Sequence, residues 1–276
     1  MKSLLFLLVF IIFSQPVSAL VGCVPTADSD SHIIHCKMIV GNYPRPVHVY
    51  IPESIQKNES LKVLLHFHGH NLAGYDHFYR TKNTGEGYGD YAAFLLKSKI
   101  NGVLIIPESL GNCSTYDSFF ADPIRTSLFL NSLEKIIDNE ISTNDRQWII
   151  SGHSGAYRVL NKLAGYFNQD KTGLLQNVLG IGLFDATYGN VSNIELWIKN
   201  KGEKNEDFIF YNSYVSGAKA TAEPGSVRLQ KILREYHSDK IFLKPLASKS
   251  DSSVLDQHFS VLKVGGLTSF WQRFSL

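Results

Sequence analysis

The sequence has 276 residues, of which 44% are hydrophobic and 19% charged. This balance is typical of a globular protein, and the chain is long enough for one large core. The formal net charge of +2 is too small to indicate a nucleic-acid partner or an anionic membrane surface.

The first 19 residues predict a secretory signal peptide. Lys2 supplies a positive start, residues 4–13 are apolar, and Val17-Ser18-Ala19 is a small-residue cleavage site. The apolar run is too short for a stable transmembrane helix, and no later run is long enough to cross a bilayer. We therefore expect a secreted or periplasmic protein whose mature chain is residues 20–276.

Three cysteines remain after the predicted cleavage, namely Cys23, Cys36 and Cys113. An exported protein permits disulfides, and a bond between Cys23 and Cys36 would staple the N-terminal strands. Cys113 would then be a lone thiol in a loop. As an alternative, Leu-Val-Gly-Cys at 20–23 fits a bacterial lipobox, in which Cys23 would carry a lipid anchor.

In chain order, the pattern begins with two strands and continues as strands that alternate with helices. Residues 33–40 and 47–51 predict an antiparallel opening ribbon. Continuous apolar runs then predict buried strands at 61–67, 102–107, 148–150, 177–184, 207–215 and 240–246. Helices are predicted at 90–99, from Asp122-Pro123 onward, at 157–167, from 192 and at 224–237. A loop carrying Asp251, Asp256 and His258 is expected after the last strand.

Strands that are apolar along their whole length indicate a parallel sheet covered on both faces. Right-handed crossovers then give the α/β class, a doubly wound, mostly parallel sheet with helices on both faces and an antiparallel N-terminal ribbon. No internal repeat, low-complexity tract or linker divides residues 20–276, so we expect a single domain.

One stretch combines a strand, a tight turn and a helix around a serine. Residues 148–150 are apolar, the turn is Gly152-His153-Ser154-Gly155-Ala156, and apolar residues follow at helical spacing. Such a turn holds the serine in a strained backbone conformation, with its hydroxyl exposed at the end of a sheet. The stretch resembles the nucleophile elbow of the α/β-hydrolase superfamily, with Ala156 in place of the usual last glycine.

The resemblance implies a catalytic triad in the chain order serine, acid, histidine. His258 follows the last predicted strand and is the expected base, since a serine hydroxyl needs a base within hydrogen-bond reach. Asp185 ends the strand after the elbow helix and is the expected acid. Many relatives place the acid one strand later, where Glu223 is the rival.

A serine hydrolase also needs two backbone N–H groups that stabilise the oxyanion. Gly155, directly after the nucleophile, is expected to supply one of them. The other is expected from Gly69 or His70, in the loop after strand 61–67. The loop begins with the His68-Gly69 pair that is typical of this position in α/β-hydrolases.

The same loop permits a metal hypothesis. His66, His68 and His70 alternate along the chain, and imidazole is a common zinc ligand. The spacing resembles the histidine motif of metallo-β-lactamase-like hydrolases but lacks its aspartate and fourth histidine. We therefore expect neither a metal nor a cofactor.

Aromatic residues gather in two loops that are expected to rise over the serine, at about 71–89 and 109–121. The second loop contains Tyr116, Phe119 and Phe120. Such side chains either line an acyl or aryl pocket or anchor their loop, and the sequence leaves both alternatives open.

The sequence therefore predicts an exported serine hydrolase that cleaves a carboxylic ester through an acyl-enzyme. Gly-His-Ser-Gly-Ala-Tyr-Arg at 152–158 and Leu-Phe-Asp-Ala-Thr-Tyr-Gly at 183–189 resemble a group of exported bacterial hydrolases, which implies the machinery but no substrate. One alternative is a serine peptidase or amidase acting on peptide or cell-wall material. Another is a catalytically silent relative that binds a ligand or partner.

Overall fold

The computed structural model describes residues 19–28, 31–40, 42–69, 91–109, 114–143, 145–169, 177–204, 206–217, 222–234, 236, 239–249, 252–263 and 266–275. Residues 1–18 of the predicted signal peptide lie outside this set, as do Cys113, Asp251 and the loop at 70–90. The cleavage site and the mature boundary therefore stay predictions.

Among the described residues, nine strands form one sheet in the order β1-β2-β3-β5-β4-β6-β7-β8-β9. The strands are β1 (Ala19–Asp28), β2 (Ser31–Val40), β3 (Tyr43–Ile51), β4 (Leu61–Phe67), β5 (Gly102–Pro107), β6 (Arg146–His153), β7 (Val178–Phe184), β8 (Ile209–Ser216) and β9 (Ile241–Ala247). Strands β4 to β9 pair in parallel, whereas β1, β2 and β3 are antiparallel and β3 joins the edge of β5. The predicted α/β class, with a mostly parallel sheet and an antiparallel ribbon, is confirmed.

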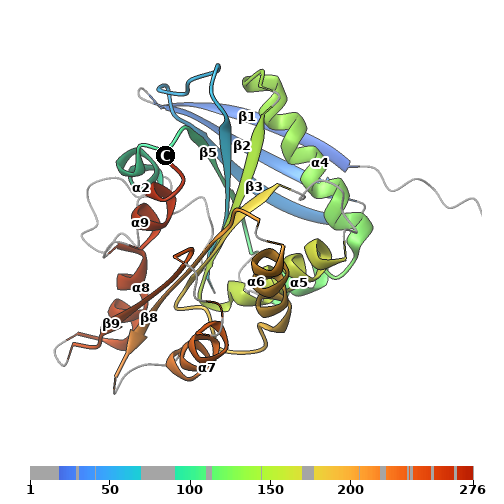
Figure 1. The fold of residues 1–276 in the computed structure, drawn as a ribbon. Helices are drawn as coiled ribbons and strands as arrows, with labels where there is room; N and C mark the ends of the chain where they lie inside the picture. The colour runs from blue at the N-terminus through green and yellow to red at the C-terminus, as the bar shows by residue number, and fades with distance from the viewer. Residues whose placement is uncertain are drawn as a thin grey trace, which may run out of the picture.

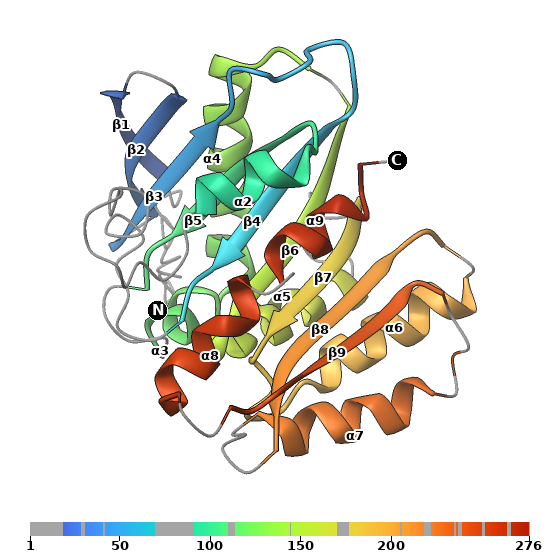
Figure 2. The same cartoon turned by 90° about the vertical axis from the view of Figure 1, so that its left-hand side faces the viewer.

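Helices lie on both faces of this sheet (Figures 1 and 2). One face carries α2 (Tyr91–Ser98), α8 (Val254–Lys263) and α9 (Leu267–Gln272). The other carries α4 (Pro123–Glu140), α5 (Tyr157–Asn168), α6 (Ser192–Glu203) and α7 (Glu223–Leu233), while the short α3 (Ser114–Phe119) precedes α4. Of the helices that the structure describes, none is both long and apolar enough to cross a membrane.

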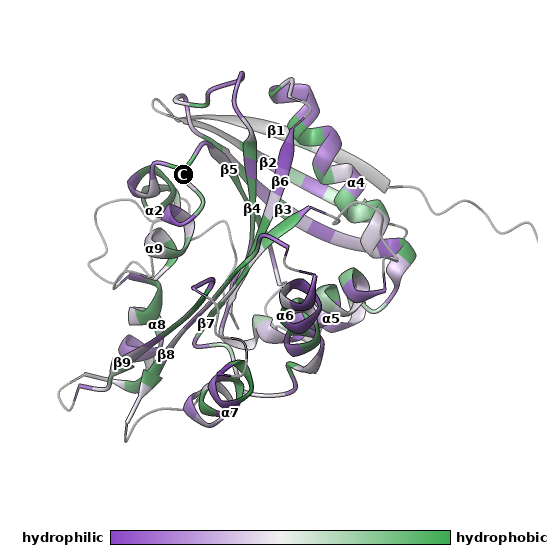
Figure 3. Cartoon of the chain, viewed as in Figure 1, coloured by the Kyte–Doolittle hydropathy of each residue, from purple (hydrophilic) through white to green (hydrophobic). Residues whose placement is uncertain are grey.

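The apolar strand residues fill two cores, one on each side of the sheet. In β4, Val63 and Leu65 belong to the core under α4 and α5, whereas Leu64 belongs to the core under α2 and α9. This alternation follows from the two-residue period of a strand. The covering helices carry hydrophilic residues beside hydrophobic ones, because each faces the sheet on one side only (Figure 3).

The N-terminal ribbon has one strand more than the sequence predicts. Strand β1 lies at the edge of the sheet, where a proline such as Pro25 is tolerated because its missing N–H is not needed by a further strand. Cys23 and Cys36 face each other across β1 and β2 and form a disulfide, with their Cα atoms 4.0 Å apart. A Cys23 in this bond has no free thiol to carry a lipid.

Candidate active site

Ser154 sits at the sharp turn between β6 and α5. It begins a single 3₁₀ turn, η1 (Ser154–Ala156), and has a φ of 57°, in the left-handed region that non-glycine residues rarely adopt. The turn is tight because a Cβ on Gly152 would lie 2.8 Å from the Cβ of Ala156. Glycine at 152 therefore makes room for the methyl group of Ala156. Ala156 is the residue that stands where the usual elbow pattern has its last glycine.

Asp185 and His258 meet beside this turn. Asp185 follows β7, the strand next to β6, and its Oδ2 accepts a hydrogen bond from Nδ1 of His258 at 2.5 Å. Its Oδ1 accepts the backbone N–H of Val215 at 3.1 Å. The Asp185 side chain is only 1% exposed, so its charge is held among donors rather than in water. Since Nδ1 faces the acid, Nε2 of His258 is the nitrogen left to accept a proton.

The sequence prediction that His258 lies in a loop is wrong, because His258 lies within helix α8. The start of this helix is a capping box, in which Ser253 Oγ accepts the N–H of Asp256 at 3.0 Å and Asp256 Oδ2 accepts the N–H of Ser253 at 3.3 Å. Ser-x-x-Asp in the sequence was the available signal. Asp256 is therefore a capping residue, and the helix fixes the position of His258.

Glu223, the rival acid, lies elsewhere. It begins α7, and its Oε2 accepts the backbone N–H of Gly217 at 3.2 Å. Of the two carboxylates, the structure brings Asp185 to His258.

His153 packs against His258 and is hydrogen-bonded to it. Its side chain is fully buried, its ring stacks on that of His258 with centroids 4.3 Å apart, and its Nε2 donates to the His258 carbonyl at 3.0 Å. Burial lowers the pKa of His153 well below its usual value, and the neighbouring His258 lowers it further. His153 is therefore neutral at neutral pH.

Ser154 and His258, both within the described residues, form no direct hydrogen bond with each other. Catalytic hydrogen bonds are often long in structures without a bound substrate and shorten when the substrate binds.

The loop after β4 approaches the serine at Gly69. A Cβ on Gly69 would lie 2.9 Å from the Cβ of Ser154 and 3.1 Å from Nδ1 of His153. His68 fixes this loop, since its Nδ1 donates to the Gly69 carbonyl at 2.8 Å and its Nε2 accepts the Ser109 N–H at 3.1 Å. His70 lies outside the described residues. Gly155 is the second residue of η1, where a helical N–H has no partner within the helix.

Two histidines of the metal hypothesis, His66 and His68, are among the described residues, and both have other partners. His66 is buried and its Nδ1 contacts Ser151 Oγ at 2.9 Å, while both ring nitrogens of His68 make the contacts given above. In the part of the chain that the structure describes, no group of three or more His, Cys, Asp or Glu side chains is placed to hold a metal ion.

Sequence reasoning missed one residue of this site, Tyr188. Its hydroxyl lies 3.1 Å from Asp185 Oδ2 and 3.1 Å from His258 Nδ1. The signal available was its place three residues after the acid, in a turn whose conformation the sequence alone does not fix.

Three aromatic residues of the 109–121 segment pack into the core and anchor the described part of this segment. Tyr116, Phe119 and Phe120 are fully buried, and both Tyr116 and Phe120 pack edge to face on Phe67 at the end of β4. Tyr116 and Phe119 lie in α3, a helix where a loop was expected.

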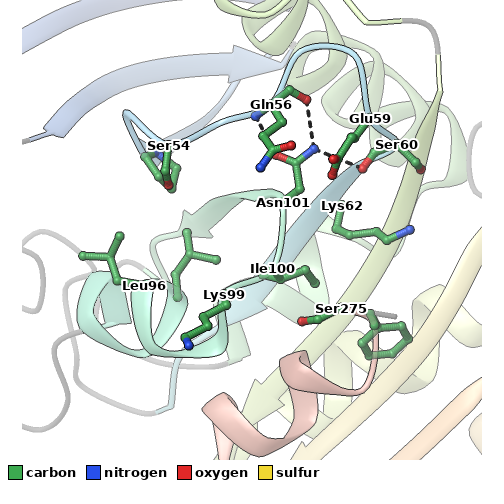
Figure 4. A pocket seen from close by; sticks show the side chains of 13 residues that line it. Ser54, Gln56, Glu59, Ser60, Lys62, Leu96, Lys99, Ile100, Asn101 and Ser275 are labelled. Atoms are coloured by element: carbon green, nitrogen blue, oxygen red, sulfur yellow. Dashed lines mark hydrogen bonds between the residues drawn. The ribbon is translucent and has the colours of Figure 1, made fainter.

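A cavity of about 470 Å³ lies at the opposite edge of the sheet (Figure 4). Its wall includes Lys62, near the start of β4, and Asn101, which precedes β5, whereas Ser154 follows the end of β6. The Asn101 side chain is already bonded to the backbone of Gln56 and Ser60. The cavity is therefore remote from the serine site.

Comparison with solved structures finds the same architecture in enzymes of low sequence identity. A ferulic acid esterase matches with a TM-score of 0.56 and 10% identity, over 94% of this chain and 99% of its own. A feruloyl esterase module from Clostridium thermocellum, complexed with sinapinate, gives 0.58 and 13%, over 95% of each chain. An S-formylglutathione hydrolase from Agrobacterium tumefaciens gives 0.56 and 10%, over 92% of this chain and 99% of its own.

These likenesses show the fold, and the chain has the α/β-hydrolase fold that its sequence predicts. The sequence itself matches no family model and no curated protein.

Proposed function

We propose that this protein is a serine hydrolase that cleaves carboxylic esters. The observation that carries the proposal is the position of the bonded Asp185–His258 pair beside the strained turn of Ser154. A strained serine next to an oriented histidine is the arrangement that activates a hydroxyl nucleophile. The esterase fold of the similar structures supports the ester as the substrate class.

In the proposed mechanism, Nε2 of His258 takes the proton of Ser154 as Oγ attacks the ester carbonyl. Asp185 keeps the Nδ1–H tautomer and stabilises the imidazolium that forms. The N–H groups of Gly155 and of the Gly69–His70 segment stabilise the oxyanion, and each such donor typically contributes about 3 kcal/mol to the transition state.

Collapse of the tetrahedral intermediate breaks the ester C–O bond, and His258 returns its proton to the leaving alcohol. Water then attacks the acyl-enzyme with His258 again as the base, which releases the acid and restores Ser154.

Export belongs to the same proposal. The N-terminal apolar segment is the reason to place the enzyme outside the cytoplasm, and the Cys23–Cys36 disulfide is consistent with an oxidising compartment. The disulfide favours a soluble mature protein over the lipoprotein alternative. Protein sequencing of the exported form from its N-terminus tests the cleavage site, expected after Ala19.

A panel of p-nitrophenyl esters of increasing acyl length, a feruloyl ester and peptide p-nitroanilides tests the function. The proposal expects turnover of at least one ester and none of it in Ser154→Ala. Cleavage of the anilides at the higher rate would instead support the peptidase or amidase alternative. Binding without turnover of any substrate would favour the alternative of a catalytically silent protein that binds a ligand.

A further inference from the structure

We propose that Tyr188 is a positioning residue of the acid–base pair, which holds Asp185 and reduces the share of its charge that acts on His258. The proposal rests on the proposed function, since it concerns the same histidine. It starts from two contacts of the Tyr188 hydroxyl, which lies 3.1 Å from Asp185 Oδ2 and 3.1 Å from His258 Nδ1.

The direction of these hydrogen bonds follows from chemistry. A carboxylate only accepts, so the Tyr188 hydroxyl donates to Oδ2 of Asp185. The Nδ1–H of His258 points at the same oxygen, 2.5 Å away, which leaves the Tyr188 oxygen at 3.1 Å as its secondary partner. Oδ2 therefore receives two donors, one from the base and one from the tyrosine.

The segment that carries Tyr188 is held in place. Asp185 has a φ of 43°, so the chain turns back directly after β7. Thr187 is 2% exposed, and its hydroxyl bonds the Ala222 carbonyl at 2.7 Å and Ser226 Oγ at 2.6 Å. A Cβ on Gly225 would lie 1.8 Å from the Thr187 carbonyl oxygen, so α7 packs directly on this segment. The backbone at Tyr188 is therefore held in place, with the Tyr188 hydroxyl beside Asp185 and His258.

These two contacts have opposite effects on His258. Donation to Asp185 neutralises part of the carboxylate charge and so favours the neutral imidazole. The lone pair that faces Nδ1 favours the imidazolium. The first effect is the larger, because a hydrogen bond to a charged acceptor is about twice as strong as a neutral one and the Nδ1 proton is already engaged. His153, the other titratable group that stacks on His258, is unchanged in the variants below.

The test is the titration of His258 in Tyr188→Phe. The titration is monitored by NMR on protein in which histidine is labelled at ¹³Cε1. Among the ten histidines the signal is assigned by its loss in His258→Gln. Tyr188→Phe retains the ring and removes one oxygen of a side chain that is 40% exposed, so the fold is kept. Tyr157→Phe is the matched control, since its ring lies 6.5 Å from that of Tyr188 and its hydroxyl packs against Gly189.

We expect the titration midpoint in Tyr188→Phe to rise by about 0.5 to 1 pH unit, the equivalent of one hydrogen bond, and to stay at the wild-type value in Tyr157→Phe. The acidic limb of kcat/KM against pH should move by the same amount, with KM unchanged. An unmoved or lowered midpoint in Tyr188→Phe, or an equal shift in Tyr157→Phe, overturns the proposal. Because the NMR titration needs no turnover, it decides this point even if no ester is hydrolysed.

Discussion

Ser154 and Asp185 both adopt a left-handed backbone, with φ of 57° and 43°, directly after the neighbouring strands β6 and β7. The two strands end side by side, with His153 paired to Phe184, so Ser154 and Asp185 lie at the same edge of the sheet. A left-handed conformation costs a non-glycine residue roughly 1–2 kcal/mol. The surrounding packing therefore holds strain at the two residues that are proposed to act together.

The strain at Ser154 predicts a difference between two inactive variants. Ser154→Gly relieves the backbone conformation, whereas Ser154→Ala keeps it. We expect the glycine variant to have a free energy of unfolding about 1 kcal/mol higher than the alanine variant, measured by urea denaturation. Equal stability, or a more stable alanine variant, would show that the turn is not strained.

The acid can be tested by two amide substitutions that are matched in size. Asp185→Asn should lower kcat by about 10⁴-fold, because the amide can hold the histidine in the wrong tautomer. Glu223→Gln removes a carboxylate that is bonded to the backbone of Gly217 and not to His258, and it should change kcat less than about threefold. If the Glu223 variant loses activity and the Asp185 variant retains it, the acid is misassigned.

The close approach of Gly69 predicts that a methyl group is not tolerated there. In Gly69→Ala the added carbon would meet Ser154 Cβ at 2.9 Å and His153 Nδ1 at 3.1 Å, so the proposed oxyanion loop must move away from Ser154. We expect kcat to fall by about 10²- to 10³-fold, the loss of one oxyanion donor.

Gly22→Ala is the control for this substitution, because a Cβ at Gly22 meets no atom within 4 Å. Its kcat and its free energy of unfolding should match those of the wild type. Full activity in Gly69→Ala would remove this loop from the proposed oxyanion site.

Burial of His153 predicts a loss of stability in mild acid. The pKa of His153 is lowered well below its usual value in the folded state, so the unfolded chain binds a proton near pH 6.5 that the folded chain does not. The free energy of unfolding should therefore fall as the pH drops from 7 to 5, by at most about 2 kcal/mol for this residue. His35, whose pKa burial lowers to about 4, acts in the same direction.

The measurement is urea denaturation at pH 7 and pH 5 in the wild type and in His153→Phe, with His35→Gln as a second variant. Each substitution should reduce the difference in stability between the two pH values. A difference that is unchanged in both variants would contradict the assignment of His153 and His35 as histidines whose pKa is lowered in the folded protein.

The sequence predicted the parallel sheet because its strands are continuous apolar runs, which Val63, Leu64 and Leu65 illustrate by filling both cores. It predicted the turn at Ser154 because small residues at Gly152 and Ala156 let the strand and the helix approach each other without a clash. Strand β1 was missed because Gly22 and Pro25 weaken a strand pattern, and the pairing with β2 that stabilises it lies outside any local window.

The rest of the site depends on contacts between distant segments. The helix around His258 begins at a Ser253–Asp256 capping box, a pattern that is easily taken for a polar loop. Tyr188 joins the acid only because Asp185 turns left-handed and Thr187 is bound to α7. Neither the turn nor the docking of α7 has a signature in the residues near Tyr188.

Covalent labelling of Ser154 tests the central claim most directly. The protein is treated with a fluorophosphonate probe, digested and examined by mass spectrometry, with Ser154→Ala alongside. We predict one adduct on the peptide that contains Ser154 in the wild type, and none in the alanine variant. No labelling of the folded wild type, or equal labelling of Ser154→Ala, would contradict the serine hydrolase mechanism.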